Sequence, residues 1–212
     1  KIIIKIFFLD KISIFSKKKK IQNISLKINR GDFLIIKGSN AKGKSLLLKL
    51  FYLKLLPSMG SLFLNGKKVT EESKILITEF RKKMGVILQN DYLIPFFSVY
   101  QNIELASQIQ KIETNFSERM KEISEWLDLK DIKDEKVINL SNSQKQKVVI
   151  ARALINNPKI IVADQPEIFL DDNSKRKIFY LLESLCRIGA TVIITSNNSQ
   201  NINVPHKILE LQ

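Results

Sequence analysis

Cysteine and histidine are almost absent from this 212-residue chain, which holds one of each, Cys186 and His206. A lone cysteine excludes a disulfide framework and a cysteine-based zinc site, and a lone histidine excludes a metal site built from several histidines. The 7 glycines and 5 prolines are too few for a low-complexity chain. No apolar run approaches the roughly 18 residues of a membrane span, and the apolar start lacks the small-residue cleavage site of a secretory signal. We therefore expect a soluble, globular protein of a reducing compartment.

Acidic residues are also in deficit, because 35 Lys and Arg face 21 Asp and Glu, which leaves a net charge of +14. A basic surface favours anionic partners such as phospholipid, nucleic acid or nucleotide. The chain is also saturated with Lys, Ile, Asn and Phe, whose codons are A/T-rich, so the base composition of the gene is an alternative source of the charge. The charge alone therefore selects no function.

The length, at roughly 150 residues per domain, allows one large domain or two small lobes around one core. Residues 2–36 read as short strands. Residues 61–69 read as a hairpin around Asn65-Gly66, the pair that type I′ turns need. Between these strands, a helix is expected over residues 44–56.

Fully apolar strands alternate with helices in the later part of the chain. Strands are expected at Lys159–Ala163 and Thr191–Thr195, with a helix over 174–187 between them; this alternation predicts a parallel sheet covered on both faces. One face of an amphipathic helix is outlined by three apolar residues at the spacing i, i+3 and i+7: Met120, Ile123 and Leu127.

The predicted fold class is therefore α/β, within a single domain over residues 1–212. Its core, with a parallel sheet and an N-terminal antiparallel β portion, comprises residues 1–91 and 141–212. Residues 92–140 are expected to form a helical subdomain inserted into that core.

Residues 38–45 match the phosphate-binding pattern G-x-x-x-x-G-K-[ST], between the apolar strand FLIIK and a helix. Gly38 and Gly43 let the backbone curl, so that successive N–H groups form a nest for phosphate oxygens beside the helix N-terminus. Lys44 reaches the β- and γ-phosphates, and the Ser45 hydroxyl binds Mg²⁺. The rest of the loop and the next helical residue complete the predicted nucleotide site: Ser39, Asn40, Ala41, Lys42 and Leu46.

A second apolar run, KIIVAD, ends in Asp164. Open α/β sheets bind ligands at the carboxyl ends of their strands, so the carboxylate there can hold the water shell of Mg²⁺. A structural acidic cap is the alternative. The two motifs together predict nucleotide binding and leave the reaction open.

Five further segments follow in order: VILQN (86–90), LSNSQKQKVVIARAL (140–154), ADQP (163–166), Leu170-Asp171 and TVIITSNN (191–198). They resemble the Q-loop, signature, Walker B, D-loop and switch motifs of the ABC-type ATPases, and they cover almost the whole chain. The resemblance implies the P-loop NTPase core of that family, with ATP and Mg²⁺ as cofactors. It also implies a head-to-tail homodimer that holds two ATP, each between one protomer's phosphate loop and the other's signature.

The resemblance assigns roles to single residues. Gln89 takes the Q-loop position, which serves both Mg²⁺ and the catalytic step. Phe15 falls where the family stacks an aromatic ring on adenine, with a strand residue facing the core as an equal alternative. The implied nucleotide contacts of the signature and D-loop are Ser141, Asn142, Ser143, Gln144 and Asp171. The spacing Ser141-x-x-Gln144 also fits a capping box for the helix that follows.

Two departures from the family weaken hydrolysis. Gln165 stands where the family has the glutamate that polarises the attacking water, and Asn197 stands where it has the switch histidine. An amide cannot accept the proton, and general-base catalysis contributes about 10²–10⁴-fold to such rates. The signature also lacks both of its glycines. We therefore expect ATP binding with impaired turnover.

Within the family, residues 80–105 are most similar to the cell-division ATPases of the FtsE type, which couple to the membrane protein FtsX. This similarity implies an ATP-binding subunit at the cytoplasmic face of the inner membrane. It would dimerise with ATP and couple to a separate FtsX-like or other integral-membrane permease. The apolar segment Tyr92–Phe97 would then lie in the groove for the partner, with burial as an equal alternative.

Two other functions stay open. Lipoprotein-release and macrolide-export ATPases share much of the same pattern, which allows an export ATPase with residual hydrolysis. The alternative from another class is a non-hydrolysing, nucleic-acid-associated ABC protein, which the positive charge suggests. Such proteins usually carry two cassettes and this length holds one, so no nucleic-acid partner is expected; a salt-sensitive RNA complex would favour it.

Overall fold

Two β-sheets of different kinds carry the fold in the computed structural model, which describes residues 5–16, 20–39, 43–89, 92–110, 115–196 and 202–211. The antiparallel sheet has the order β2-β1-β4-β5: β1 (Lys5–Phe15), β2 (Lys20–Asn29), β4 (Met59–Leu64) and β5 (Lys67–Lys68). The parallel sheet has the order β6-β7-β8-β3-β9: β3 (Phe33–Lys37), β6 (Met84–Ile87), β7 (Ile160–Asp164), β8 (Thr191–Thr195) and β9 (Lys207–Glu210).

Strands β7 and β8 form the centre of the parallel sheet and are buried along their whole length. They are apolar on both faces because the sheet is covered on both sides. Asp164 pairs with Thr195, and Thr195 pairs with Ile36 on the other side. The carboxyl ends of β7, β8 and β3 therefore meet at one edge of the sheet, which confirms the predicted parallel α/β core.

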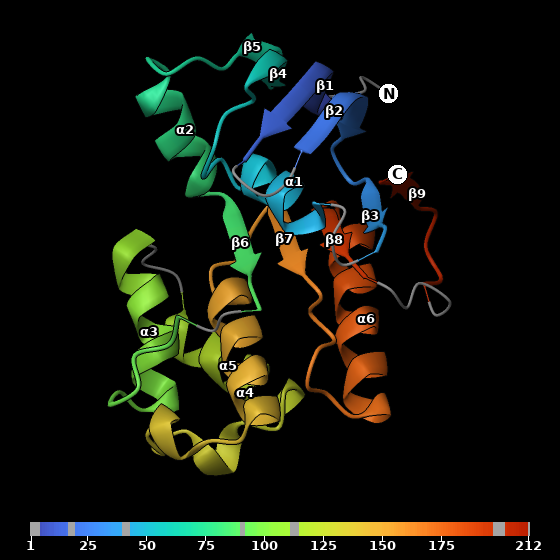
Figure 1. Ribbon diagram of the computed structural model, residues 1–212. Coiled ribbons are helices and arrows are strands. Elements are labelled where there is room, and N and C mark those ends of the chain that lie inside the picture. The colour runs from blue at the N-terminus through green and yellow to red at the C-terminus, as the bar shows by residue number, and fades with distance from the viewer. Residues whose placement is uncertain are drawn as a thin grey trace.

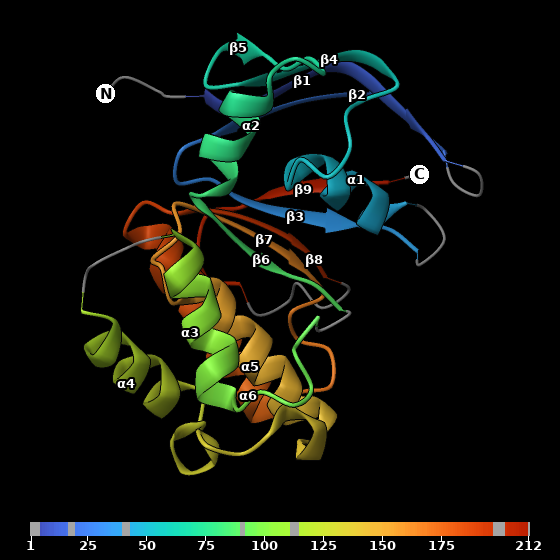
Figure 2. The same ribbon diagram turned by 90° about the vertical axis from the view of Figure 1, so that its left-hand side faces the viewer.

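Helices cover the parallel sheet on both faces (Figures 1 and 2). Figure 2 shows α1 between the two sheets, with α5 and α6 against the opposite face of the parallel sheet. The helices are α1 (Lys44–Phe51), α2 (Lys74–Arg81), α3 (Val99–Gln110), α4 (Phe116–Trp126), α5 (Asn142–Leu154) and α6 (Asp172–Arg187). Two short 3₁₀ turns, η1 (Lys130–Ile132) and η2 (Val137–Asn139), lead from α4 to α5.

Helix α1 is shorter than its sequence predicts, because it ends at Phe51 and not at residue 56. Leu53 adopts a left-handed conformation, with φ of 62°, and the N–H of Lys54 donates to the carbonyl oxygen of Lys49 over 2.8 Å. This turn closes the helix and buries Leu53, which is 3% exposed. The leucine-rich run therefore continues the apolar core without continuing the helix.

The predicted type I′ hairpin is present between β4 and β5. Asn65 and Gly66 both have positive φ angles, of 48° and 80°. The two strands pair in antiparallel register directly beside the turn. A short-range signal was sufficient here because the turn chemistry is contained in two adjacent residues.

The hydrophobic core lies in two clusters on opposite faces of the parallel sheet. In the first, the ring of Phe7 packs edge to face on Phe51 and Phe80, with centroid distances of 5.3 and 5.4 Å. The second joins the sheet, α5 and α6 to the predicted insertion, from which Met120 and Leu127 are buried. The amphipathic face predicted for this segment is thereby confirmed, whereas its separation as a helical subdomain over 92–140 stays a prediction.

None of the helices in the described parts of the chain combines the length and the apolar character that crossing a membrane requires.

Gly85 of β6 provides a test of this packing. A Cβ atom at this position would lie 2.4 Å from the carbonyl oxygen of Ala153 and 2.9 Å from Cγ of Pro158. We expect Gly85→Ala to lower the free energy of unfolding by about 1–3 kcal/mol or more, because the added methyl group overlaps backbone atoms. Urea denaturation measures the loss.

Gly66→Ala is the matched control, because its added methyl group meets nothing within 4 Å and only the φ of 80° opposes it. Its expected cost is about 1 kcal/mol. A loss for Gly85→Ala no larger than for Gly66→Ala would contradict the close packing of β6 on the end of α5 and the loop after it.

Candidate functional site

The phosphate loop connects the carboxyl end of β3 to α1. Gly43 has φ of 90°, and a Cβ atom there would lie 2.9 Å from Cγ1 of Ile21, so the loop requires glycine at this position. Lys44 is buried, and its Nζ donates to the carbonyl oxygen of Gly38 across the loop. Among the described residues, α1 starts with neither a side-chain cap nor an acidic residue in its first turn. Such a helix start suits an anion.

The three residues predicted to bind Mg²⁺ line one pocket of about 210 Å³. Ser45 comes from the start of α1, Gln89 from the loop after β6, and Asp164 from the end of β7. Hydroxyl, amide and carboxylate oxygens are the ligand types that Mg²⁺ prefers. The fold thus brings the predicted ligands together, and their metal-binding role stays a prediction. The pocket is also lined by Leu48, Lys49, Tyr52, Lys54, Leu88 and Tyr92.

Asp164 is the acidic centre of this pocket and is 7% exposed. The hydroxyl of Thr195 donates to its Oδ1 over 2.6 Å, which fixes the orientation of the carboxylate. Burial raises the pKa of Tyr52, and the negative charge of Asp164 raises it further. Tyr52 therefore stays neutral beside the carboxylate.

Gln165 and Gln89 meet directly at the edge of the sheet. Nε2 of Gln89 donates to Oε1 of Gln165 over 2.6 Å. Gln165 has a left-handed backbone, with φ of 47°, and its N–H donates to the carbonyl and hydroxyl oxygens of Thr195 at 3.1 and 3.0 Å. Two neutral amides therefore occupy the positions to which the sequence assigns the catalytic step, and neither can take a proton from water.

Glu167 is a buried carboxyl group beside this site that the sequence analysis missed. It is 9% exposed, and the hydroxyl of Ser196 donates to its Oε1 over 2.6 Å. Its Oε2 is buried without a hydrogen-bond partner among the described residues. Burial raises the pKa of the Glu167 carboxyl, against the lowering effects of the Ser196 hydrogen bond and the Lys175 charge. The available signal was a glutamate inside the otherwise apolar run that follows β7.

The signature residues stand at the start of α5. The Ser141 hydroxyl accepts from the N–H of Gln144 at 3.2 Å, and the N–H of Ser141 donates to Oε1 of Gln144 at 2.9 Å, so the predicted capping box is confirmed. Neither these two residues nor Asn142 and Ser143 between them line the pocket at Ser45. A single protomer therefore does not bring its signature to this pocket.

Asp171 caps the N-terminus of α6. Its carboxylate accepts from the N–H and the hydroxyl of Ser174, at 2.9 and 2.8 Å, and these bonds lower the pKa of Asp171 to about 2.

Phe15 lies at the end of β1 and is 47% exposed, so its ring does not face the core. Four predicted site residues lie outside the described residues: Asn40, Ala41, Lys42 and Asn197.

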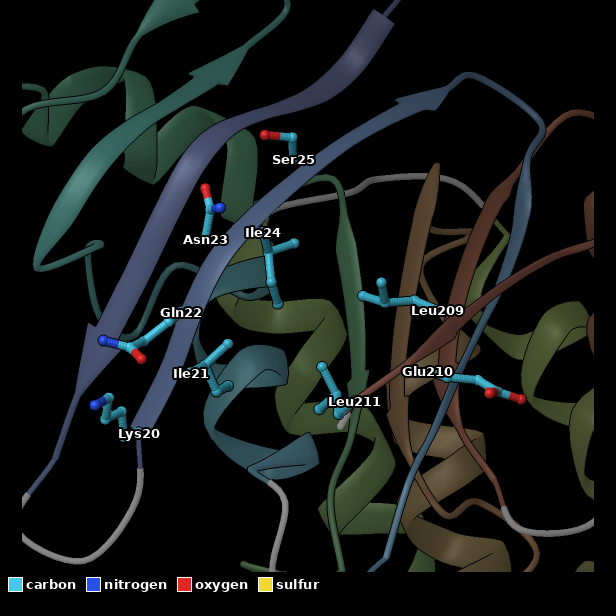
Figure 3. A pocket seen from close by; sticks show the side chains of 9 residues that line it. All are labelled: Lys20, Ile21, Gln22, Asn23, Ile24, Ser25, Leu209, Glu210 and Leu211. Atoms are coloured by element: carbon cyan, nitrogen blue, oxygen red, sulfur yellow. The ribbon is translucent and has the colours of Figure 1, made fainter.

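A larger hollow, of about 500 Å³, lies between the edge strands β2 and β9, as Figure 3 shows. The apolar side chains of Ile21, Ile24, Leu209 and Leu211 line it, and its one acidic lining residue is Glu210. None of the residues predicted to bind nucleotide or metal lines this hollow. The predicted Mg²⁺ ligands therefore lie in the smaller pocket, at Ser45, Gln89 and Asp164, and not in this hollow.

The pH dependence of stability tests the burial of Glu167. Because its pKa is raised in the folded protein, the folded state holds this proton more tightly than the unfolded chain does. Its contribution to stability is complete below the ordinary glutamate pKa of about 4.3 and is lost as pH rises through the raised value. Glu167→Gln should remove this loss, as measured by urea denaturation across that pH range.

Glu122→Gln, on the exposed side of α4, controls for the removal of one carboxylate. An unchanged pH dependence in Glu167→Gln would contradict the burial of an ionisable group at this position.

The comparisons with known proteins agree on one family. Residues 21–167 match the family model described as ABC transporter. The methionine import ATP-binding protein MetN of Clostridium acetobutylicum is 35% identical over 188 residues, which cover 88% of this chain and 59% of MetN. The macrolide export ATP-binding/permease protein MacB of Bdellovibrio bacteriovorus is 36% identical over 188 residues, which cover 87% of this chain and 28% of MacB. The cell division ATP-binding protein FtsE of Streptococcus pneumoniae is 30% identical over 194 residues, which cover 91% of this chain and 84% of FtsE.

Solved structures show the same fold. A dimeric ATP-binding cassette in a post-hydrolysis state, bound to ADP and Pi, is 29% identical and matches with a TM-score of 0.86. The match covers 97% of this chain and 94% of that one. The expected α/β fold of an ABC ATPase is thereby confirmed, and the chain belongs to the ABC transporter family of ATP-binding cassettes.

Proposed function

We propose that this chain is the ATP-binding subunit of an FtsE-type membrane complex. The subunit dimerises with ATP and couples to a separate permease, and it hydrolyses ATP slowly or not at all. The hydrogen bond of 2.6 Å between Gln89 and Gln165 supports the slow hydrolysis, and the similarity to FtsE, of which the match covers 84%, supports the type of complex. The hydrogen bond leaves two amides where hydrolysis needs a base. Cassettes of this family bind ATP, pair with one another and work with membrane subunits. What we propose beyond this is the type of membrane complex and the low rate of ATP hydrolysis.

The residues of the pocket fit Mg²⁺ and the phosphates of ATP. Lys44 and the uncapped start of α1 would hold the β- and γ-phosphates, since the loop supplies a buried ammonium and requires glycine at position 43. Ser45, Gln89 and Asp164 would hold Mg²⁺, which would neutralise the phosphate charge. Phe15, whose ring is exposed at the end of β1, would stack on the adenine.

Hydrolysis requires a group that takes the proton from the attacking water. Gln165 cannot do so, and its amide oxygen is engaged by Gln89. Asp164 is held by the hydroxyl of Thr195, and Glu167 is buried against Ser196. Losing the base would slow the step by about 10²–10⁴-fold, which corresponds to about 3–5 kcal/mol of barrier.

A second protomer would complete each nucleotide site. Ser141 and Gln144 cap α5 but do not line the pocket of their own chain, so the signature would serve the ATP of the partner. In the same dimer Asp171 would stand near the interface, at the start of α6. The helical subdomain over residues 92–140 would carry the signature toward the partner.

The loop after β6 is the proposed contact with the permease. Tyr92 is 62% exposed and Phe96 is 72% exposed, whereas Leu93 between them is 7% exposed and belongs to the core. The loop is therefore anchored by one apolar residue and offers others to a partner. The carbonyl oxygen of Tyr92 accepts from Arg152 of α5 at 2.9 Å, which ties the loop to the core. Such a contact would place the chain at the cytoplasmic face of the inner membrane, with no nucleic acid needed.

A transport ATPase is the second candidate, because MetN and MacB are as similar to this chain as FtsE is. In that case the chain would serve import or export and would need residual hydrolysis. The rate of ATP turnover separates the two candidates.

Purified protein with Mg²⁺ should bind ATP and show no turnover above background. The double variant Gln165→Glu, Asn197→His should gain turnover by about 10²–10⁴-fold, since it restores the general base and the switch histidine. Equilibrium binding and phosphate release measure the two properties. Lys44→Ala in the double variant is the control and should abolish both.

Ordinary turnover by the unmodified protein would overturn the proposal of impaired hydrolysis and favour a transport ATPase. Absence of ATP binding would overturn the nucleotide site itself.

Phe96→Ser should weaken binding to vesicles that contain an FtsX-type permease by at least about tenfold, since exposed aromatic anchors dominate such interfaces. ATP binding should be unchanged. Ile188→Ser is the matched control, because Ile188 is 76% exposed at the far end of α6. Co-sedimentation measures the binding, and equal effects of the two variants would reject the loop as the contact.

A further inference from the structure

The turn after β7 is attached to β8 at two points. At its first residue, the N–H of Gln165 donates to the carbonyl and hydroxyl oxygens of Thr195. Two residues later, the carboxyl group of Glu167 accepts from the hydroxyl of Ser196 over 2.6 Å. The turn is closed by its own backbone bonds, from Ile168 to Gln165 at 3.0 Å and from Leu170 to Glu167 at 3.3 Å. The turn is therefore bonded to two adjacent residues, Thr195 at the end of β8 and Ser196 directly after it.

The bonds between this turn and β8 hold Gln165 in a strained backbone conformation. Gln165 has φ of 47°, a left-handed conformation that is unfavourable for a residue with a side chain. The conformation persists only where the surroundings hold it. It is also the conformation in which the Gln165 side chain meets Gln89. Contacts that hold the turn therefore also hold the amide pair.

Glu167 is the ionisable member of this attachment. Ser196 is fully buried and Glu167 is 9% exposed, so water does not replace their bond readily. The charged groups that act on Glu167 are Lys175 of α6 and Asp164 of β7, and Lys175 is also paired with Asp172 at 3.0 Å. Within the described ranges Oε2 of Glu167 has no hydrogen-bond partner, so the bond from Ser196 is the side-chain contact that holds this carboxyl group.

We propose that Glu167 is a positioning residue: through Ser196 it holds the turn in which Gln165 meets Gln89, and it thereby sets the preference of the site for ATP over ADP. This inference rests on the proposed function, in which the pocket at Ser45, Gln89 and Asp164 holds the nucleotide. Gln89 of the amide pair lines that pocket together with Ser45 and Asp164. In the proposed function the γ-phosphate, by which ATP differs from ADP, would lie beside these residues. A displaced turn separates the two amides and leaves the β-phosphate contacts of Lys44 in place.

The test compares the dissociation constants for ATP and ADP, both with Mg²⁺, in four proteins: the unmodified chain, Glu167→Gln, Glu167→Leu and Ser196→Ala. Glu167→Gln keeps an acceptor oxygen of the same reach, so the ratio of the two constants should stay within about twofold. Glu167→Leu and Ser196→Ala remove one partner of a buried bond. They should weaken ATP binding by about tenfold and leave ADP binding unchanged.

Two further variants separate positioning from general damage. Glu183→Leu removes another buried glutamate, which is 2% exposed and accepts from the N–H of Asn203 at 2.9 Å. It should lower stability without changing the ratio. Gln89→Ala should raise the dissociation constant for ATP relative to that for ADP. Adding Glu167→Leu to it should have little further effect, because both act through the same amide pair.

An unchanged ratio in both Glu167→Leu and Ser196→Ala would overturn the inference, as would an equal loss of ATP and ADP binding. If Glu167→Leu does not fold, Ser196→Ala decides alone. Absence of binding to both nucleotides in the unmodified chain would instead overturn the proposed function.

Discussion

The parallel pairing of β7 with β8 is the constraint on which the rest of the site depends. It places Asp164 opposite Thr195, whose hydroxyl then orients the carboxylate. It also places Gln165 beside the same threonine, which holds its N–H. A slip of one residue would turn the side chain of Asp164 to the other face of the sheet. Because β6 and β3 flank this pair in the same direction, the Q-loop and the phosphate loop leave the sheet at the same edge.

In the described part of the chain, the site combines groups suited to phosphate with two amides, Gln89 and Gln165, that cannot act as a base. Lys44, the start of α1 and the oxygen ligands of the pocket suit an anion with its metal. The two glutamines are neutral at every physiological pH, and the nearby Glu167 is buried against Ser196. Binding and proton transfer depend on different residues here, so one can persist when the other is lost.

The sequence predicted correctly those turns and helix caps whose geometry depends only on residues close together in the chain. The Asn65-Gly66 turn and the capping box at Ser141 and Gln144 need only neighbouring residues, and both are present. Helix α1 is the counterexample, because Leu53 leaves the helix to become buried under the antiparallel sheet, although its propensity favours the helix. Propensity was outweighed there by burial of apolar surface, which depends on residues distant in the sequence.

The sequence by itself determined the family, the phosphate-loop motif, the parallel core and the glutamine at position 165, where the family resemblance implies a glutamate, because each is written in residue identity and spacing. Only the tertiary structure decided that Gln165 bonds to Gln89 and that Glu167 is buried against Ser196. These contacts join residues 76 and 29 positions apart. No local pattern encodes them, since they exist only once the pairing of β6, β7 and β8 brings the loops to one edge.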